Sequence, residues 1–211
     1  MTAPLTPLIG LGGLKRAGKD AVADILVAEY GFVKIGMSDP LHEAMLALDP
    51  IIPINEYADA GGFGAVGRFV RYSELVAQVG YVNAKTNTEA RRLLQKLGTE
   101  VSRNLVGENV WVDIATRSIL HHLDAGTPVV VTGIRFDNEL FAIEDIGGDT
   151  VWIERPEVTE AAARSESTTA AHASEVTLRR SAFSYAIIND STLEDLRESV
   201  GLFLSTRGYL R

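Results

Sequence analysis

The sequence predicts an α/β fold in which five strands alternate with helices and form one parallel sheet covered on both faces. Three observations predict it. Short apolar runs recur between segments of helical period. The run Pro128–Thr132 is apolar and β-branched throughout, as in a strand buried on both faces. A glycine-rich turn separates the first strand from the first helix. The 211 residues, 46% of them hydrophobic, suit a single domain over 1–211.

The expected strands are five apolar runs: Leu8–Leu11, Phe32–Met37, Pro128–Thr132, Thr150–Ile153 and Tyr185–Ile188. Helices are expected after the glycine turn, from Ser38 with Pro40 in the first helical position, over about 109–124, before Gly147 and after the N-cap Thr192. The clearest helix is Glu89–Leu105, with an expected apolar stripe of Leu93, Leu97, Val101 and Leu105. Asp49–Arg71 has no sustained period and is expected to be a long irregular loop outside the core.

The turn between the first strand and helix carries the pattern G-x-x-x-x-G-K from Gly13 to Lys19. Glycines let successive N–H groups point into one cavity, and the lysine supplies a mobile charge for phosphates. Asp20 stands where Ser or Thr usually reaches magnesium, so either its carboxylate does that work or the loop is a subtype. A plain glycine-rich turn is the alternative, which the flanking strand and helix disfavour.

Composition limits the function. The net charge of −8 argues against a nucleic-acid polymer as ligand. We find no apolar run long enough for a membrane span, no secretion signal and no cysteine, so a cytoplasmic protein is expected.

Polar residues follow the other predicted strands at the edge where parallel sheets bind ligands: Ser38, Asp39, Arg135, Arg155 and Asn189. This convergence indicates an enzyme. The polar side of the Glu89–Leu105 helix is either solvated only or suited to a monophosphate and a base edge; it carries Arg92, Gln95, Thr99 and Arg103.

The chain resembles the bacteriophage deoxynucleoside monophosphate kinases over nearly its whole length. The resemblance lies in six segments taken in order: Gly13–Asp20, Leu93–Glu100, Gly133–Glu139, Ile153–Pro156, His172–Glu175 and Ile188–Asp190. It implies phosphorylation of a deoxynucleoside monophosphate by ATP with Mg²⁺, in a homodimer, with a monophosphate-binding excursion at about 40–106 and a lid at about 156–177.

The residues and the resemblance together assign the expected roles. Catalysis is expected of Lys15, Arg16, Lys19 and Arg135. ATP is expected at Gly13, Arg16, Ala17, Gly18, Lys19, Asp20, Ala21, Arg155 and Asn189. The monophosphate is expected at Lys15, Ser38, Asp39, Arg92, Gln95, Thr99, Arg103, Arg135, Asn138, Glu139, Ser174 and Glu175. The family usually has an acidic residue where this chain has Gly133, which leaves Asp20 and Asp39 as candidate metal carboxylates.

Direct in-line transfer is the expected mechanism, because an ionised acceptor phosphate needs no strong general base. One alternative is another small-molecule kinase, since the phosphomevalonate kinases of animals have a similar loop. The other is a nucleotide-binding module that hydrolyses or senses ATP.

Overall fold

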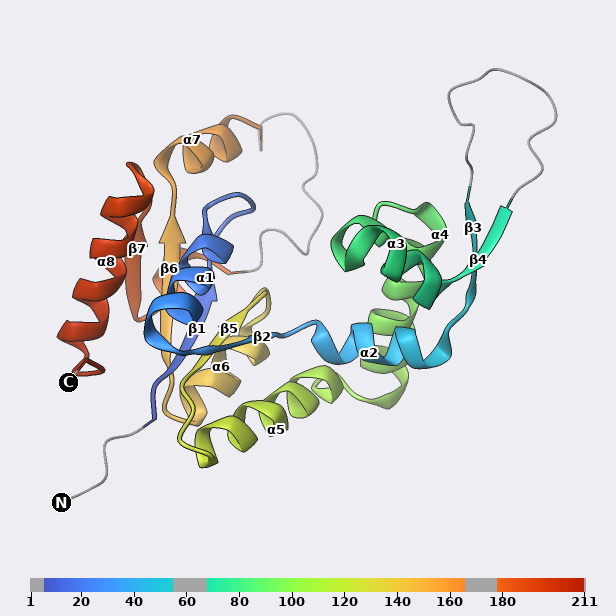
Figure 1. The fold of residues 1–211 in the computed structure, drawn as a ribbon, viewed down its shortest axis with the longest axis horizontal. Helices are drawn as coiled ribbons and strands as arrows, with labels where there is room; N and C mark the ends of the chain where they lie inside the picture. Colours follow the sequence, from blue (N-terminus) through green and yellow to red (C-terminus); the bar gives the residue numbers. More distant parts are fainter. Residues whose placement is uncertain (1–5, 55–67, 166–177, 211) are drawn as a thin grey trace. The chain divides into compact units, whose positions relative to one another are not determined.

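The computed structural model describes residues 6–54, 68–165 and 178–210 (Figure 1). Its contacts divide the chain into two compact units, Met1–Met37 with Val112–Arg211, and Ser38–Trp111. None of the helices in these described ranges is both long and apolar enough to cross a membrane.

The first unit contains a five-stranded parallel sheet, as predicted. In sheet order its strands are β2 (Val33–Gly36), β5 (Val129–Thr132), β1 (Leu8–Gly12), β6 (Asp149–Glu154) and β7 (Tyr185–Ile188). β1 is central and pairs with β5 and β6, in the register Ile9 to Val130 and Leu11 to Val151. Because all five strands are parallel, their carboxyl ends lie at one edge of the sheet.

Helices cover both faces of this sheet, which confirms the predicted fold class. α1 (Lys19–Tyr30) and α8 (Leu193–Thr206) pack on one face, where Ile9 and Leu11 of β1 are buried. α5 (Val110–Asp124) and α6 (Asp137–Asp145) pack on the other, against Leu8 and Val131. Successive residues of a strand point to opposite faces, so β1 contributes to both cores.

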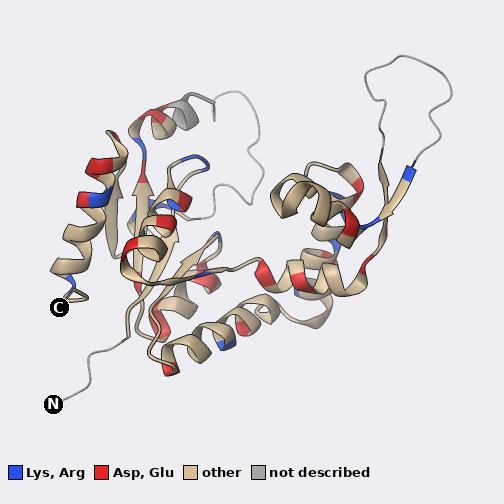
Figure 2. Ribbon diagram, in the orientation of Figure 1, with Lys and Arg blue, Asp and Glu red and all other residues tan. Residues whose placement is uncertain are grey.

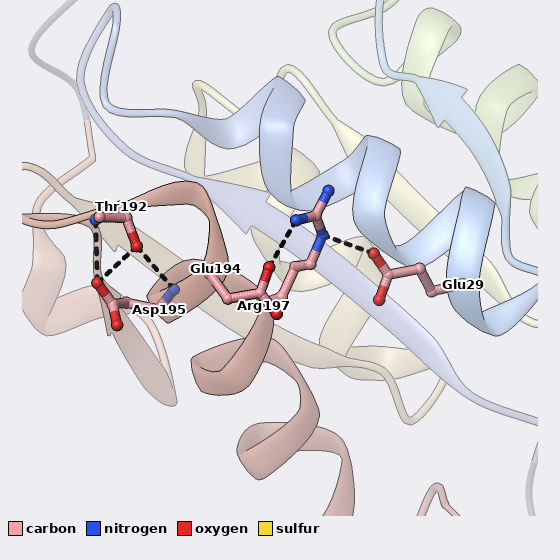
Figure 3. A network of polar contacts seen from close by, with 5 residues as sticks. All are labelled: Glu29, Thr192, Glu194, Asp195 and Arg197. Atoms are coloured by element: carbon pink, nitrogen blue, oxygen red, sulfur yellow. Dashed lines mark hydrogen bonds and ion pairs between the residues drawn. The ribbon is translucent and has the colours of Figure 1, made fainter.

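Polar contacts also join α8 to α1 (Figure 3). Thr192 caps α8 as predicted, accepting from the N–H of Asp195 at 3.2 Å, while the Asp195 carboxylate accepts from the N–H of Thr192 at 3.1 Å. One turn later, Arg197 bonds to Glu194 of its own helix and to Glu29 of α1, each at 2.9 Å. The contact between Arg197 and Glu29 joins α8 to the helix that begins at the glycine loop.

The second unit has its own core, formed mainly by Met45, Ile52, Val70, Tyr72, Leu75, Ala84, Ala90 and Leu94. Its elements are α2 (Asp39–Leu48), β3 (Ile51–Ile54), β4 (Arg68–Arg71), α3 (Tyr72–Ala84), α4 (Thr88–Gln95) and the π-helix η1 (Lys96–Val106). α2 begins one residue before Pro40, which therefore takes the second helical position. Neither α3 nor its kink at Gly80 was expected from the sequence.

The prediction of an irregular loop over Asp49–Arg71 is wrong for its described ends. β3 and β4 pair antiparallel, with Ile52 opposite Val70. Both of these residues are buried in the core of the second unit, while Ile51 and Phe69 are more than half exposed. The strands are only four residues long, too short for a clear alternation to stand out in sequence.

The predicted apolar stripe over 89–105 is also wrong in its second half. The buried residues are Ala90, Leu94, Gly98 and Ser102, whereas Val101 is 44% and Leu105 79% exposed. These buried residues keep one four-residue spacing through α4 and η1, next to the expected stripe, of which Leu93 and Leu97 are only partly buried against the core. Spacing alone therefore could not tell which of two neighbouring stripes is buried, because small residues occupy the buried one at Ala90, Gly98 and Ser102.

Candidate active site

The glycine loop lies between β1 and α1, at the carboxyl edge of the sheet. Gly13 has a φ of 140° and Gly18 a φ of 102°, both in the region that favours glycine. A Cβ on Gly13 would lie 2.4 Å from the Ile153 carbonyl oxygen, and a Cβ on Gly18 would lie 2.2 Å from Asn189 Nδ2. Both glycines are thus required by backbone angle and by close approach, as expected of a loop that wraps an anion.

Lys19 is the first residue of α1, and its ammonium turns back over the loop. Nζ donates to the carbonyl oxygens of Gly13 at 2.9 Å and Leu14 at 2.8 Å. Burial lowers the pKa of Lys19; the Asp20 carboxylate acts to raise it, and Arg135 lowers it further. A poorly solvated cation beside a second positive charge favours an anionic ligand.

Four other loop residues were assigned to the site. Lys15 and Arg16 are exposed, and the loop appears as a basic segment in Figure 2. Arg16 has a φ of 68°, a left-handed conformation that costs a non-glycine residue about 1 kcal/mol. Ala17 is buried and its N–H donates to Leu14 O at 3.1 Å, while Ala21 is half-buried in the first turn of α1.

The segment after β5 brings Arg135 to the same edge of the sheet. Gly133 has a φ of 81°, and an added Cβ would meet only Met37 N, at 3.9 Å. The backbone angle, and not lack of space, therefore disfavours the acidic residue that the resembling family has here. Glu139 accepts from the N–H groups of Arg135 at 2.7 Å and Phe136 at 3.2 Å, so it orders the start of α6. Asn138 is half-buried in the first turn of that helix.

β6 and β7 deliver Arg155 and Asn189. Arg155 is exposed, with Nε 3.7 Å from Glu157 Oε2 at the start of α7 (Pro156–Ser165). The backbone N–H of Asn189 donates to Glu154 O at 2.7 Å, and its side-chain Nδ2 donates to Ala17 O at 2.9 Å. Asn189 thus holds the glycine loop directly.

The remaining expected acceptor residues belong to the second unit or lie outside the described residues. Ser38 and Asp39 are exposed at the start of α2. Arg92 pairs with Glu89, with Nε 2.7 Å from Oε2, and Gln95 and Thr99 are exposed. Arg103 has a side chain only 18% exposed, 3.6 Å from Glu108. Ser174, Glu175 and the later part of the expected lid lie outside the described residues. The roles of these residues stay predictions.

The loop offers the kind of ligand that Mg²⁺ prefers, a carboxylate oxygen. Mg²⁺ usually keeps several waters and takes one or two carboxylates together with substrate phosphates. Asp20 offers one carboxylate beside Lys19 with a side chain 85% exposed, while Asp39 belongs to the second unit. Within the described ranges there is no group of three or more Asp, Glu or His that could hold a metal by itself. A metal here would therefore depend on phosphate ligands.

Sequence reasoning missed two side chains that contact the loop or its flanking residues. Lys34 of β2 binds Asp20, as described below, and its significance becomes visible only once β2 and α1 are placed together. Phe183, which precedes β7, packs over Gly12, where a Cβ would lie 2.0 Å from its ring. Neither Lys34 nor Phe183 belongs to a sequence motif that would have indicated its contact.

A glycine loop and a half-buried lysine at the centre of a parallel α/β sheet define a P-loop protein, in which a bound phosphate would face several cations. The family model of deoxynucleotide monophosphate kinase matches residues 57–200, which begin after the glycine loop. The chain belongs to the deoxynucleotide monophosphate kinase family. It is therefore an enzyme, a nucleotide kinase that transfers a phosphoryl group.

Two relatives align over most of the chain. The deoxynucleotide monophosphate kinase of Enterobacteria phage T4 is 25% identical over 90% of this chain and 95% of its own length. A protein of Acanthamoeba polyphaga mimivirus, provisionally assigned the same activity, is 26% identical over 92% of this chain and 93% of its own.

Similar solved structures include shikimate kinase from Aquifex aeolicus, with 12% identity, a TM-score of 0.49 and coverage of 97% of this chain and 99% of that one. Dephospho-CoA kinase from Campylobacter jejuni has 15% identity, a TM-score of 0.46 and coverage of 94% and 96%.

Proposed function

We propose that this enzyme transfers the γ-phosphoryl group of ATP to the phosphate of a deoxynucleoside monophosphate, in line and without a covalent intermediate. One observation carries the proposal. The Lys19 ammonium is held by Gly13 O and Leu14 O at the carboxyl edge of the sheet, where burial lowers its pKa and the positive charge of Arg135 lowers it further. Lys19 follows β1 and Arg135 follows β5, so two strand ends supply positive charge at the same edge of the sheet. Phosphoryl transfer between two phosphates requires such charge neutralisation.

In this proposal the loop binds the donor. Backbone N–H groups between Gly13 and Gly18 and the N-terminus of α1 would surround the β- and γ-phosphates, and Lys19 would neutralise charge that develops on them. Arg16 and Arg155, both exposed at the same edge, would add charge around the triphosphate. Asn189 would act indirectly, by holding the loop at Ala17.

The acceptor would lie on the Arg135 side. Its phosphate would bind Arg135 and Lys15, and its base and sugar would bind polar residues of the second unit such as Thr99 and Arg103. The acceptor phosphate is already ionised at neutral pH, so positioning and charge neutralisation supply the catalysis. Mg²⁺, held by Asp20 and the phosphates, would supply further charge neutralisation when bound. The proposal also includes homodimer formation, which the family resemblance implies, and a location in the host cytoplasm, with which the viral relatives are consistent.

The decisive experiment measures ADP release in a coupled assay with ATP and each deoxy- and ribonucleoside monophosphate in turn. We expect release to require a deoxynucleoside monophosphate, and Lys19→Ala to reduce it by about a thousand-fold or more. Arg117→Ala, which removes an exposed cation from α5, is the matched control. ADP release that needs no monophosphate would favour an ATPase or sensor. ADP release from ATP that occurs with added phosphomevalonate, and with none of the nucleoside monophosphates, would favour the other small-molecule kinases.

A further inference from the structure

A single cation on the edge strand β2 binds two carboxylates of α1. Lys34 Nζ lies 3.2 Å from Asp20 Oδ1 and 3.1 Å from Asp24 Oδ1. Asp20 and Asp24 are one helical turn apart and therefore share the face of α1 that Lys34 meets. The Lys34 side chain is 34% exposed, against 85% for Asp20 and 71% for Asp24.

Asp20 is also the carboxylate that directly follows Lys19 in the first turn of α1. Its contact with Lys34 therefore places a positive charge beside the first turn of α1. The ammonium contacts Oδ1 of the carboxylate that a metal ion at this position would bind, and its positive charge opposes the approach of a second cation.

Exposed ion pairs contribute little to stability, so the contact between Lys34 and Asp20 is weak and can be exchanged for another. The second aspartate, Asp24, makes it easier for Lys34 to leave Asp20. If Lys34 leaves Asp20, Asp24 still compensates its charge. Asp24 therefore provides the alternative partner that allows the Asp20 carboxylate to be released.

On the basis of the proposed function, we infer that Lys34 is a positioning residue that competes with Mg²⁺ for the Asp20 carboxylate, and that Asp24 weakens this competition by holding Lys34. The inference concerns how the donor site acquires its metal, and it does not depend on which monophosphate is the acceptor.

The inference predicts opposite effects of two substitutions. Lys34→Met removes the competitor, so the Mg²⁺ concentration that half-saturates ATP binding should fall about two- to five-fold, the range of an exposed ion pair. Asp24→Asn leaves Asp20 as the remaining carboxylate partner of the two and should raise that concentration by a similar factor. Lys34→Arg, which keeps the charge, should stay close to the unsubstituted protein.

The measurement is calorimetric titration of ATP into the full chain at a series of Mg²⁺ concentrations, with thermal unfolding of each variant recorded in parallel. A purely structural tie between β2 and α1 would be weakened by both substitutions, so metal dependence would move in the same direction or not at all. Either result would overturn the inference.

A second arm uses Asp20→Asn as the background. If Lys34 acts through the Asp20 carboxylate, Lys34→Met should no longer change the Mg²⁺ dependence in that background, because the shared partner is gone. An unchanged effect there would also overturn the inference. Opposite shifts in metal dependence without monophosphate-dependent ADP release would sustain the inference and overturn the proposed acceptor, so the two failures are distinguishable.

Discussion

Asn189 donates a hydrogen bond from Nδ2 to the carbonyl oxygen of Ala17 at 2.9 Å, across 172 positions of the chain. The same Nδ2 would lie only 2.2 Å from a Cβ added to Gly18, too close for any side chain at that position. The end of the last strand therefore holds the phosphate loop of the first, and the shape of the loop depends on a residue that lies outside it.

Asn189→Ala should weaken ATP binding without removing a group that reacts. We expect KM for ATP to rise by about ten-fold, as for loss of a hydrogen bond from a partly buried acceptor, with a smaller change in kcat. Initial-rate kinetics with varied ATP would check this. Asp190→Ala, at the exposed neighbouring position, is the control. A fall in kcat at constant KM would indicate instead that Asn189 acts in the transfer step.

Gly18→Ala should abolish ATP binding, because the new methyl group meets Asn189 and the φ of 102° is unfavourable for alanine. Gly31→Ala is a matched control, since Gly31 has a φ of 71° and nothing within 4 Å of an added Cβ. It should lower stability by about 1 kcal/mol and leave ATP binding intact. Thermal unfolding measures the stability of both variants, and calorimetry measures their ATP binding. Equal loss of ATP binding in the two variants would contradict the assignment of Gly18 to the ATP site.

Arg135→Ala should lower kcat/KM for the monophosphate by about a hundred-fold or more, as for loss of a cation that stabilises transferring phosphate. Arg135→Lys should restore little of it, because a lysine lacks the planar fork that binds two phosphate oxygens. Steady-state kinetics with varied monophosphate would test both variants. Full activity of the lysine variant would show that charge alone is needed.

Arg207→Met should destabilise the fold and leave the chemistry intact. Asp149 is buried at the start of β6 and accepts from Arg207 at 2.7 and 2.9 Å and from Tyr209 at 2.6 Å. Removing one partner of a buried charge costs about 3 kcal/mol or more. Arg197→Met, which breaks the exposed pairs with Glu29 and Glu194, should cost far less, because solvent screens exposed ion pairs. Urea denaturation gives the free energy of unfolding of both variants. Similar losses of stability would contradict the prediction that Arg207 matters more than Arg197.

Much of the fold and the position of the glycine loop could be predicted from the sequence, because the features that encode them are local. The strand at Val129–Thr132 is a continuous β-branched run, and the helix after Lys19 has a clear apolar face. The glycine loop is a contiguous pattern whose chemistry follows from backbone freedom and one lysine. Thr192 could be predicted as an N-cap because capping involves neighbours three residues apart.

Other features were not readable, because they depend on contacts between distant segments. The buried stripe over 89–105 contains Ala90, Leu94, Gly98 and Ser102, and its small residues give no apolar signal beside the more hydrophobic neighbouring stripe. The short pairing of β3 with β4 is decided by burial of Ile52 and Val70 in a separate core.

The sequence by itself determined that a phosphate loop with Lys19 follows the first strand of a parallel α/β sheet, since local periodicity and one contiguous motif specify both. Only the tertiary structure decided that β1 lies between β5 and β6, that Asn189 holds Ala17, and that Lys34 binds Asp20. These relationships arise from packing over large sequence separations, and no single segment carries enough information to specify its partner.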